Sequence, residues 1–155
     1  MATDIAIDLN KETIETLQEL IQINIDSAKG FRHVTEECSS APIAAAFEEL
    51  ALQRKKQADE LAIHVAINDE QPHREGSYLA AVHRCWMTCR KLLSSNDLHS
   101  LLAEAERGED AVLEAYEEAC QQTLGRAIHS VLRGHRERVQ QVHDDVRNLR
   151  DALAQ

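Results

Sequence analysis

Apolar residues recur at alternating intervals of three and four along most of this chain, and that spacing is the period of one helix face. The pattern predicts five helices, at residues 11–38, 42–68, 77–94, 96–121 and 124–153. No stretch of useful length alternates apolar and polar residues in the way that a half-buried strand does. The sequence therefore predicts an all-α protein.

The residues at the ends of these segments agree with helix termini. Asn10 can cap the first helix, and Pro42 falls in the first turn of the second, where its missing N–H costs little. Either Ser95 or Asn96 can cap the fourth helix. The whole chain has only 5 Gly and 2 Pro, so few turns are available and long helices are favoured.

The lengths of the predicted helices indicate how they pack. Four of them have roughly 25 to 29 residues and are about 37 to 44 Å long, and helices of matched length form a bundle. The third helix, at residues 77–94, is shorter and can carry the chain back between two hairpins. We therefore expect a ferritin-like up-down-down-up four-helix bundle with an additional crossover helix between the second and third bundle helices. It would occupy residues 11–155, after an N-terminal tail at residues 1–10.

The charge and the cysteines restrict where such a bundle acts and what it binds. A net charge of −10 argues against nucleic-acid and membrane-surface partners, which need a basic face. The sequence shows no secretory signal and no apolar run long enough to span a membrane. Its four cysteines form no C-x-x-C pair and are expected to be reduced. We therefore expect a cytoplasmic protein whose bundle faces leave room for a homo-oligomer or a protein partner.

One polar residue interrupts the apolar stripe of each long helix. These residues are Asn24, Arg54, Glu109 and His135. In the expected topology they lie roughly 16, 20, 18 and 15 Å above the same bundle end, and so share one level near its middle. A buried carboxylate needs a partner, and one arginine supplies both the charge and the hydrogen bonds. We therefore predict a buried polar layer in which Glu109 pairs with Arg54, while Asn24 and His135 hydrogen-bond nearby.

Ferritin-like bundles hold paired metal ions at this same level, through glutamates and E-x-x-H motifs. None of the predicted helices contains an E-x-x-H motif. The nearest candidates for metal ligands are Glu106, Glu109 and His143, and a permanently cationic arginine among them would repel a divalent cation. The residues thus favour a polar layer that sets the helix register. A degenerate metal site and a small-ligand or proton-transfer pocket remain as alternatives.

Three glycines lie inside the predicted helices, where glycine weakens a helix. Gly30, Gly108 and Gly134 leave room either for close contact between helices or for a ligand, and close contact is the commoner reason. Cys85 and Cys89 lie four residues apart on the third helix, beside a tryptophan. We interpret these two thiols as small apolar residues that fill the core.

Four segments of the chain resemble a known family. They read TIETLQELIQINIDSAKGF, HRCWM, LLAEAERGEDAVLEAYEEA and VHDDVRNLRDAL. Together they are similar to a bacterial domain family of unknown function within the ferritin-like superfamily, a four-helix-bundle group. The resemblance extends over nearly the whole chain, beginning at about residue 12. It implies a ferritin-like bundle in the bacterial cytoplasm and brings no established activity and no catalytic residues.

Two classes of function follow from these observations. The first is a non-catalytic bundle with a structural, stress-related or interaction role and no cofactor. The second is an atypical iron- or manganese-binding protein, or a metal-dependent oxidoreductase. Nucleotide-binding and hydrolase functions have no support, because the sequence has no Gly-rich phosphate loop and no nucleophile motif.

Overall fold

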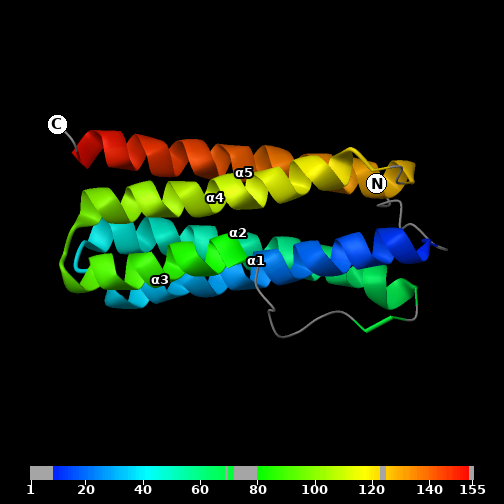
Figure 1. Ribbon diagram of the computed structural model, residues 1–155, viewed down its shortest axis with the longest axis horizontal. Helices are drawn as coiled ribbons and strands as arrows, with labels where there is room; N and C mark the ends of the chain where they lie inside the picture. Colours follow the sequence, from blue (N-terminus) through cyan, green and yellow to red (C-terminus); the bar gives the residue numbers. More distant parts are fainter. Residues whose placement is uncertain (1–8, 69, 72–79, 123–124, 154–155) are drawn as a thin grey trace.

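The computed structural model describes residues 9–68, 70–71, 80–122 and 125–153. These ranges contain five α-helices and no strand, as Figure 1 shows. The helices are α1 (Lys11–Glu37), α2 (Ala41–Ile67), α3 (Ala80–Ser94), α4 (Leu98–Cys120) and α5 (Arg126–Leu153). The prediction of an all-α protein is confirmed for this part of the chain. Residues 77–79, where the third helix was expected to begin, lie outside the described residues.

The residue that caps α1 is the one predicted from the sequence, whereas the residue that caps α4 is a different one. The Asn10 side chain accepts a hydrogen bond from the backbone N–H of Thr13 at 2.8 Å, as a capping residue does. The prediction that Ser95 or Asn96 caps α4 is wrong, because Asp97 accepts a hydrogen bond from the Ser100 N–H at 3.1 Å. Asn96 instead has a positive φ of 56°. It therefore turns the chain between α3 and α4 and leaves the capping position to the next residue.

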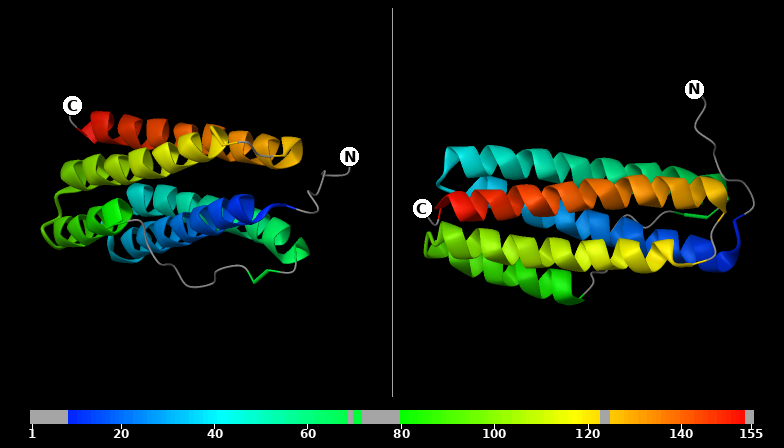
Figure 2. Two further views of the ribbon diagram at one scale, coloured as in Figure 1. Left: turned by 45° about the vertical axis from the view of Figure 1, so that its right-hand side comes forward. Right: turned by 90° about the horizontal axis from the view of Figure 1, so that it is seen from above.

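The five helices form two hairpins and a crossover helix. Figures 1 and 2 show that α1, α3 and α5 run in one direction, while α2 and α4 run in the other. The first hairpin packs α1 on α2, the second packs α4 on α5, and α3 lies against α4 and the adjacent side of α1. In the view from above, α5 lies between α2 and α4 (Figure 2, right). The four bundle helices, α1, α2, α4 and α5, therefore run up, down, down and up. In the chain, α3 comes between the first pair and the second pair.

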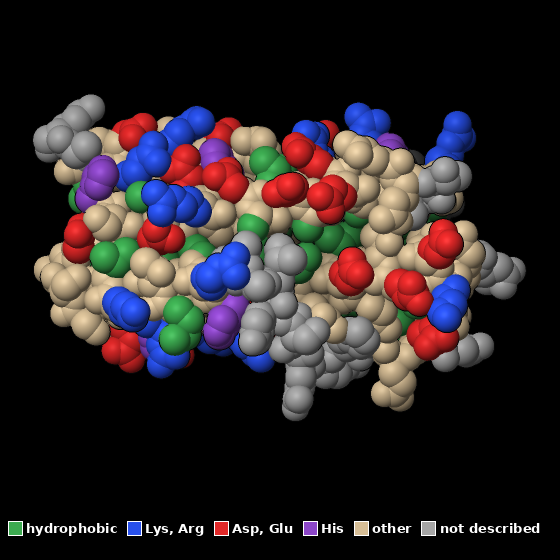
Figure 3. Space-filling view, viewed as in Figure 1, with side chains coloured by type: hydrophobic (Ala, Val, Ile, Leu, Met, Phe, Trp, Pro, Cys, Tyr) green, Lys and Arg blue, Asp and Glu red, His purple; other side chains and the backbone are tan. Residues whose placement is uncertain are grey.

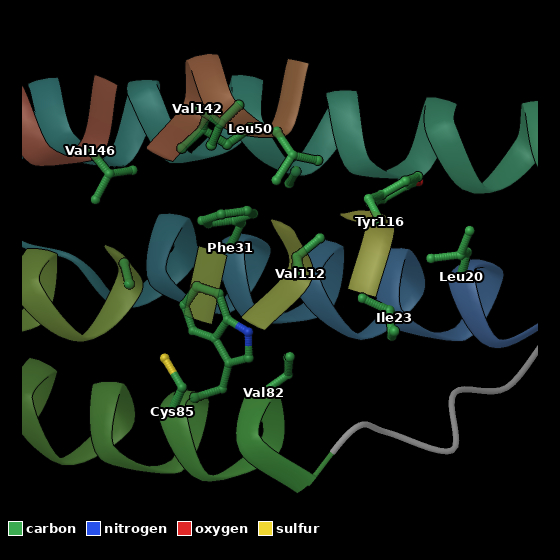
Figure 4. Packing of buried hydrophobic residues seen from close by; sticks show 14 of the residues in the cluster. Leu20, Ile23, Phe31, Leu50, Val82, Cys85, Val112, Tyr116, Val142 and Val146 are labelled. Carbon is green, nitrogen blue, oxygen red and sulfur yellow. The ribbon is translucent and has the colours of Figure 1, made fainter. Parts of the chain in front are cut away.

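The core is built mainly from Leu, Ile and Val side chains of all five helices. Figure 4 shows Val82 extending from α3 toward Val112 in the centre of the bundle. Cys85 Sγ lies 2.6 Å from the Glu104 carbonyl oxygen of α4. Trp86 of α3 packs edge-on against Phe31, with ring centroids 5.0 Å apart. The third helix is thus part of the core rather than an appendage on its surface.

Two of the three interior glycines explain how α3 docks so closely. A Cβ on Gly30 would lie 2.2 Å from Trp86 Cδ2, and a Cβ on Gly108 would lie 2.9 Å from Cys85 Sγ. A Cβ on Gly134 would meet nothing within 4 Å. Close helix contact therefore accounts for Gly30 and Gly108, and Gly134 needs a different reason.

Oppositely charged side chains lie side by side on the surface of the second hairpin. Figure 3 shows Lys and Arg side chains beside Asp and Glu side chains along α5 and α4. Among the ion pairs between these helices is that of Arg136 with Glu117, at 2.9 Å.

No described helix is long and apolar enough to cross a membrane. All four cysteines are free thiols.

Candidate functional site

A buried ion pair between α2 and α4 lies at the centre of the bundle. Arg54 and Glu109 replace apolar residues on the inward faces of their helices, so helix packing carries both side chains into the core. Their exposed fractions are 0% and 1%, and Arg54 Nη2 donates a hydrogen bond to Glu109 Oε2. Such a pair avoids an isolated buried charge, whose desolvation would be costly.

Two neighbouring side chains add hydrogen bonds to this pair. Arg54 Nη1 donates to Gln57 Oε1, one turn further along α2. Ser27 Oγ of α1 donates to Glu109 Oε1 at 3.3 Å. The Arg54 Nε has no hydrogen-bond partner. The arrangement fills the centre of the core with a fixed internal cation and its counter-ion.

A second set of polar residues leads from the core toward the surface. Asn24 Nδ2 of α1 donates to the Tyr116 hydroxyl oxygen of α4 at 2.6 Å, and the Tyr116 hydroxyl lies 3.1 Å from His135 Nδ1 of α5. His135 Nε2 lies 2.7 Å from Glu60 Oε2 of α2. We call these four side chains the polar relay. It crosses all four long helices and ends at a carboxylate that is partly exposed.

The direction of each hydrogen bond in the polar relay follows from the groups at its two ends. Asn24 Nδ2 also donates to the Leu20 carbonyl at 2.8 Å, which fixes the orientation of the amide group. Glu60 is a carboxylate and can only accept, so His135 Nε2 carries a proton. Burial lowers the pKa of His135 and keeps its ring neutral, so Nδ1 accepts a hydrogen bond from the Tyr116 O–H. The relay therefore holds His135 as one neutral tautomer.

The protonation states in the polar relay follow from burial. Burial lowers the pKa of His135, and the hydrogen bond and charge of Glu60 only partly oppose this shift. Burial also raises the pKa of the Tyr116 hydroxyl. Partial burial disfavours ionisation of Glu60, but the hydrogen bond from His135 and the nearby cations, including Arg138, lower its pKa overall. At neutral pH the relay therefore consists of a neutral tyrosine, a neutral histidine and a carboxylate.

The four polar residues that the sequence singled out are all buried, but they belong to two hydrogen-bonded groups. Arg54 and Glu109 contact each other, as expected. Asn24 and His135, which were expected to hydrogen-bond nearby, both bond to Tyr116 rather than to Arg54 or Glu109. Gln57 bridges the two groups, since it accepts from Arg54 and donates to the His135 carbonyl oxygen at 3.2 Å.

The sequence reasoning missed four participants in these groups. They are Ser27, Gln57, Glu60 and Tyr116. Three of them lie at a helical interval from a predicted residue: Ser27 and Gln57 are three positions after one, and Tyr116 is seven. A search for polar residues at intervals of three, four and seven around each core intruder would have found them. Glu60 lies six positions after Arg54, which is not a helical interval.

Of the three alternative metal ligands, Glu106 and His143 lie close to each other, while Glu109 is held by Arg54. Glu109 is bound to Arg54, whereas Glu106 pairs with Arg150 and lies 3.5 Å from His143 Nε2. The same nitrogen lies 2.7 Å from Asp110 Oδ1, at the surface between α4 and α5. No group of three or more His, Cys, Asp or Glu side chains suited to a metal ion occurs among the residues that the structure describes.

The chain does contain one E-x-x-H sequence, at residues 70–73 in the connection after α2. Of these residues only Glu70 and Gln71 are described, and neither is helical. The helix faces that meet in the bundle centre therefore contain no E-x-x-H.

Comparison with known families places this chain in one of them. The family model described as a domain of unknown function, DUF2383, matches residues 12–122. The chain belongs to the DUF2383 family. The matched region covers α1 to α4, and so contains the whole ion pair, while His135 of the polar relay lies beyond it on α5. No curated protein is similar enough to the DUF2383 chain to count as a match.

Proposed function

We propose that this DUF2383 protein is a non-catalytic ferritin-like bundle of the bacterial cytoplasm, with a structural, stress-related or interaction role and no resident cofactor. The observation that carries the proposal is the ion pair of Arg54 and Glu109 at the centre of the core. In a ferritin-like bundle the corresponding region binds metal ions through inward-facing carboxylates and histidines. Here a guanidinium supplies the positive charge that a metal ion would otherwise bring.

The order of the helices supports the ferritin-like part of this proposal. Two antiparallel hairpins joined by a connection that runs back along the bundle characterise that fold, and α3 forms such a connection here. The packing of α3 on α4 and α1 adds a fifth helix to the four of the bundle.

The buried polar groups support a structural role. Each of the two groups links helices from both hairpins, through side chains that have few alternative partners in an apolar core. A helix displaced by one turn would leave a charge or a polar group unpaired, at a cost of several kcal/mol. The polar groups therefore select one register between the hairpins. A bundle with a fixed surface is what an interaction or scaffolding role requires.

The competing function is an atypical iron- or manganese-binding protein, or a metal-dependent oxidoreductase, with Glu106, Glu109 and His143 as ligands. To bind one ion together, these residues would have to abandon their present partners, among which are Arg54 and Arg150. Such a rearrangement would expose a buried guanidinium to a second cation, which is electrostatically unfavourable.

Metal analysis of the purified protein decides between the two functions. The full chain is produced without an affinity tag, dialysed against iron, manganese and zinc salts, and freed of loosely bound ions by gel filtration. The structural proposal expects well below one equivalent of each metal, and the same result for Glu109→Gln. One equivalent of a metal that is lost in Glu109→Gln, and in His143→Gln, would overturn it.

A further inference from the structure

A pocket lies between α2 and α5 at the outer end of the polar relay. Its volume is about 450 Å³, which is within the range of small-molecule sites. Glu60, the last residue of the relay, lies in its wall together with His135. The two apolar side chains in its wall are Ile63, which is 53% exposed, and Val131. A buried hydrogen-bond chain thus ends in an open space that has both polar and apolar walls.

Gly134 in this pocket has no packing reason to be glycine. It lies in the interior of α5, where glycine costs helix stability relative to alanine. Gly30 and Gly108 are needed for the docking of α3, but a Cβ on Gly134 would meet no atom within 4 Å. The missing side chain enlarges the pocket that Gly134 lines. The bare backbone at Gly134 leaves room for a bound molecule.

His64 is the second unexplained residue of the pocket. Its side chain lines the pocket and is only 4% exposed, yet its Nδ1 has no hydrogen-bond partner. Burial lowers the pKa of His64, so the imidazole is neutral at neutral pH. A buried polar atom without a partner is uncommon in folded proteins and calls for a ligand or a bound water.

The charges of the pocket determine what kind of molecule fits. Arg138 Nη1 of α5 lies 3.6 Å from Glu60 Oε2 of α2. Both side chains are partly exposed. With both histidines neutral, the pocket has no net charge but has one negative and one positive pole. A cation alone would meet Arg138, and an anion alone would meet Glu60, so a ligand with both charges is more complementary to the pocket than either ion.

We propose that this pocket binds a small zwitterionic amino acid with an apolar side chain. The ammonium group binds Glu60, the carboxylate binds Arg138, and the apolar side chain lies against Ile63 and Val131 over the bare backbone of Gly134. A metal ion is a poorer fit, because the polar relay places the proton of His135 on Nε2 and leaves that nitrogen no lone pair. The site goes beyond the structural role proposed above and does not depend on it.

The test is a titration of the ¹⁵N-labelled full chain, followed by NMR. The probes are L-leucine and its two single-charge analogues, 3-methylbutylamine and 4-methylpentanoate. We expect L-leucine to shift the amide signals of Ile63 and Gly134 saturably, and each analogue to bind at least tenfold more weakly. No saturable shift with L-leucine, or equal binding of either analogue, would overturn the proposal.

Charge variants locate the two poles of the site. Glu60→Gln and Arg138→Gln are each expected to weaken L-leucine binding at least tenfold. The matched controls are Glu117→Gln and Arg136→Gln, which break an ion pair of similar exposure between α4 and α5. These controls should bind L-leucine as the unmodified protein does. Equal losses in the control variants would mean that general charge, and not this pocket, governs binding.

Variants of Gly134 separate binding from folding. Gly134→Leu places a side chain in the pocket, and we expect it to abolish binding while the protein melts at the same or a higher temperature. Gly134→Ala is the intermediate case, with a small loss of affinity and an intact fold. Unchanged affinity in both variants would show that the molecule binds elsewhere.

Discussion

At the scale of single residues, Arg54 and Glu109 depend on each other for their burial. Glu109→Gln keeps the shape of the side chain but leaves the Arg54 guanidinium buried without its counter-ion. We expect this substitution to lower the free energy of unfolding by about 3–5 kcal/mol. Urea denaturation followed by circular dichroism measures the difference.

The double substitution separates the charge effect from packing. Replacing Arg54 with Met and Glu109 with Leu removes both charges together and is expected to recover most of the lost stability. Gln57 then loses one hydrogen-bond partner, which limits the recovery. A Glu109→Gln variant as stable as the unmodified protein would contradict the buried ion pair.

The buried histidines make the stability of the protein depend on pH. Burial lowers the pKa of both His64 and His135 below the ordinary value of 6.5, so the unfolded chain binds more protons than the folded chain in mildly acidic solution. The stability that the neutral imidazoles confer is complete above pH 6.5 and is lost as the pH falls below it. Urea denaturation at pH 7.5 and 5.5 should therefore show a lower unfolding free energy at pH 5.5.

A pair of variants assigns this pH dependence to burial. His64→Gln should reduce the difference in unfolding free energy between pH 7.5 and 5.5, because one buried imidazole no longer titrates. His99→Gln changes an exposed histidine and should leave the difference unchanged. If both variants changed it equally, the buried histidines would not be its source.

At the scale of secondary-structure elements, the docking of α3 depends on one missing side chain. A Cβ at position 30 would lie inside the contact distance of the Trp86 ring, which is itself packed against Phe31. Gly30→Ala is therefore expected to destabilise the protein by about 1–3 kcal/mol through overpacking. Trp86 is the only tryptophan, so its fluorescence reports whether α3 moves away from α1.

Gly134→Ala is the matched control for this prediction. Both substitutions add one methyl group in a helix interior, but the space beside Gly134 is empty. We expect Gly134→Ala to stabilise the protein by up to about 1 kcal/mol, because alanine is the better helix former. Opposite signs for the two variants, measured by thermal unfolding, support the docking model, and equal signs refute it.

At the scale of the whole molecule, the family match ends before a helix that the core requires. The matched region stops at residue 122, whereas α5 supplies buried apolar side chains to the core. These residues are Ile128, Leu132, Val139, Val142 and Val146. Their burial contributes on the order of 10 kcal/mol, at about 1.5–3 kcal/mol each, which is comparable to the total stability of a domain.

A fragment of residues 1–122 should therefore not fold into a stable monomer. We expect low thermal cooperativity and aggregation, which circular dichroism melts and light scattering detect. Adding α5 as a separate peptide should restore a cooperative transition. A fragment that melts cooperatively on its own would show that α1 to α4 form an independent unit.

The sequence alone determined the helices and the burial of the polar intruders. Helix formation depends on hydrogen bonds within four residues, so an apolar repeat of three and four is enough to predict the helices of this chain. A polar residue within such a repeat must follow its neighbours into the core, as Asn24 and Glu109 do. The pairing of Glu109 with Arg54 could also be predicted, because a buried carboxylate needs a counter-charge. Among the four polar residues expected at one height in the bundle, Arg54 is the permanently charged cation.

Only the tertiary structure decided how the polar residues connect and where the open space lies. The link from Tyr116 through His135 to Glu60 depends on the rotation of three helices about their axes, which one-dimensional spacing does not specify. The three interior glycines look alike in the sequence, yet Gly30 and Gly108 face another helix while Gly134 faces a pocket. Those differences arise from long-range packing, because the identity of a neighbour across the bundle is set by the relative position of whole helices.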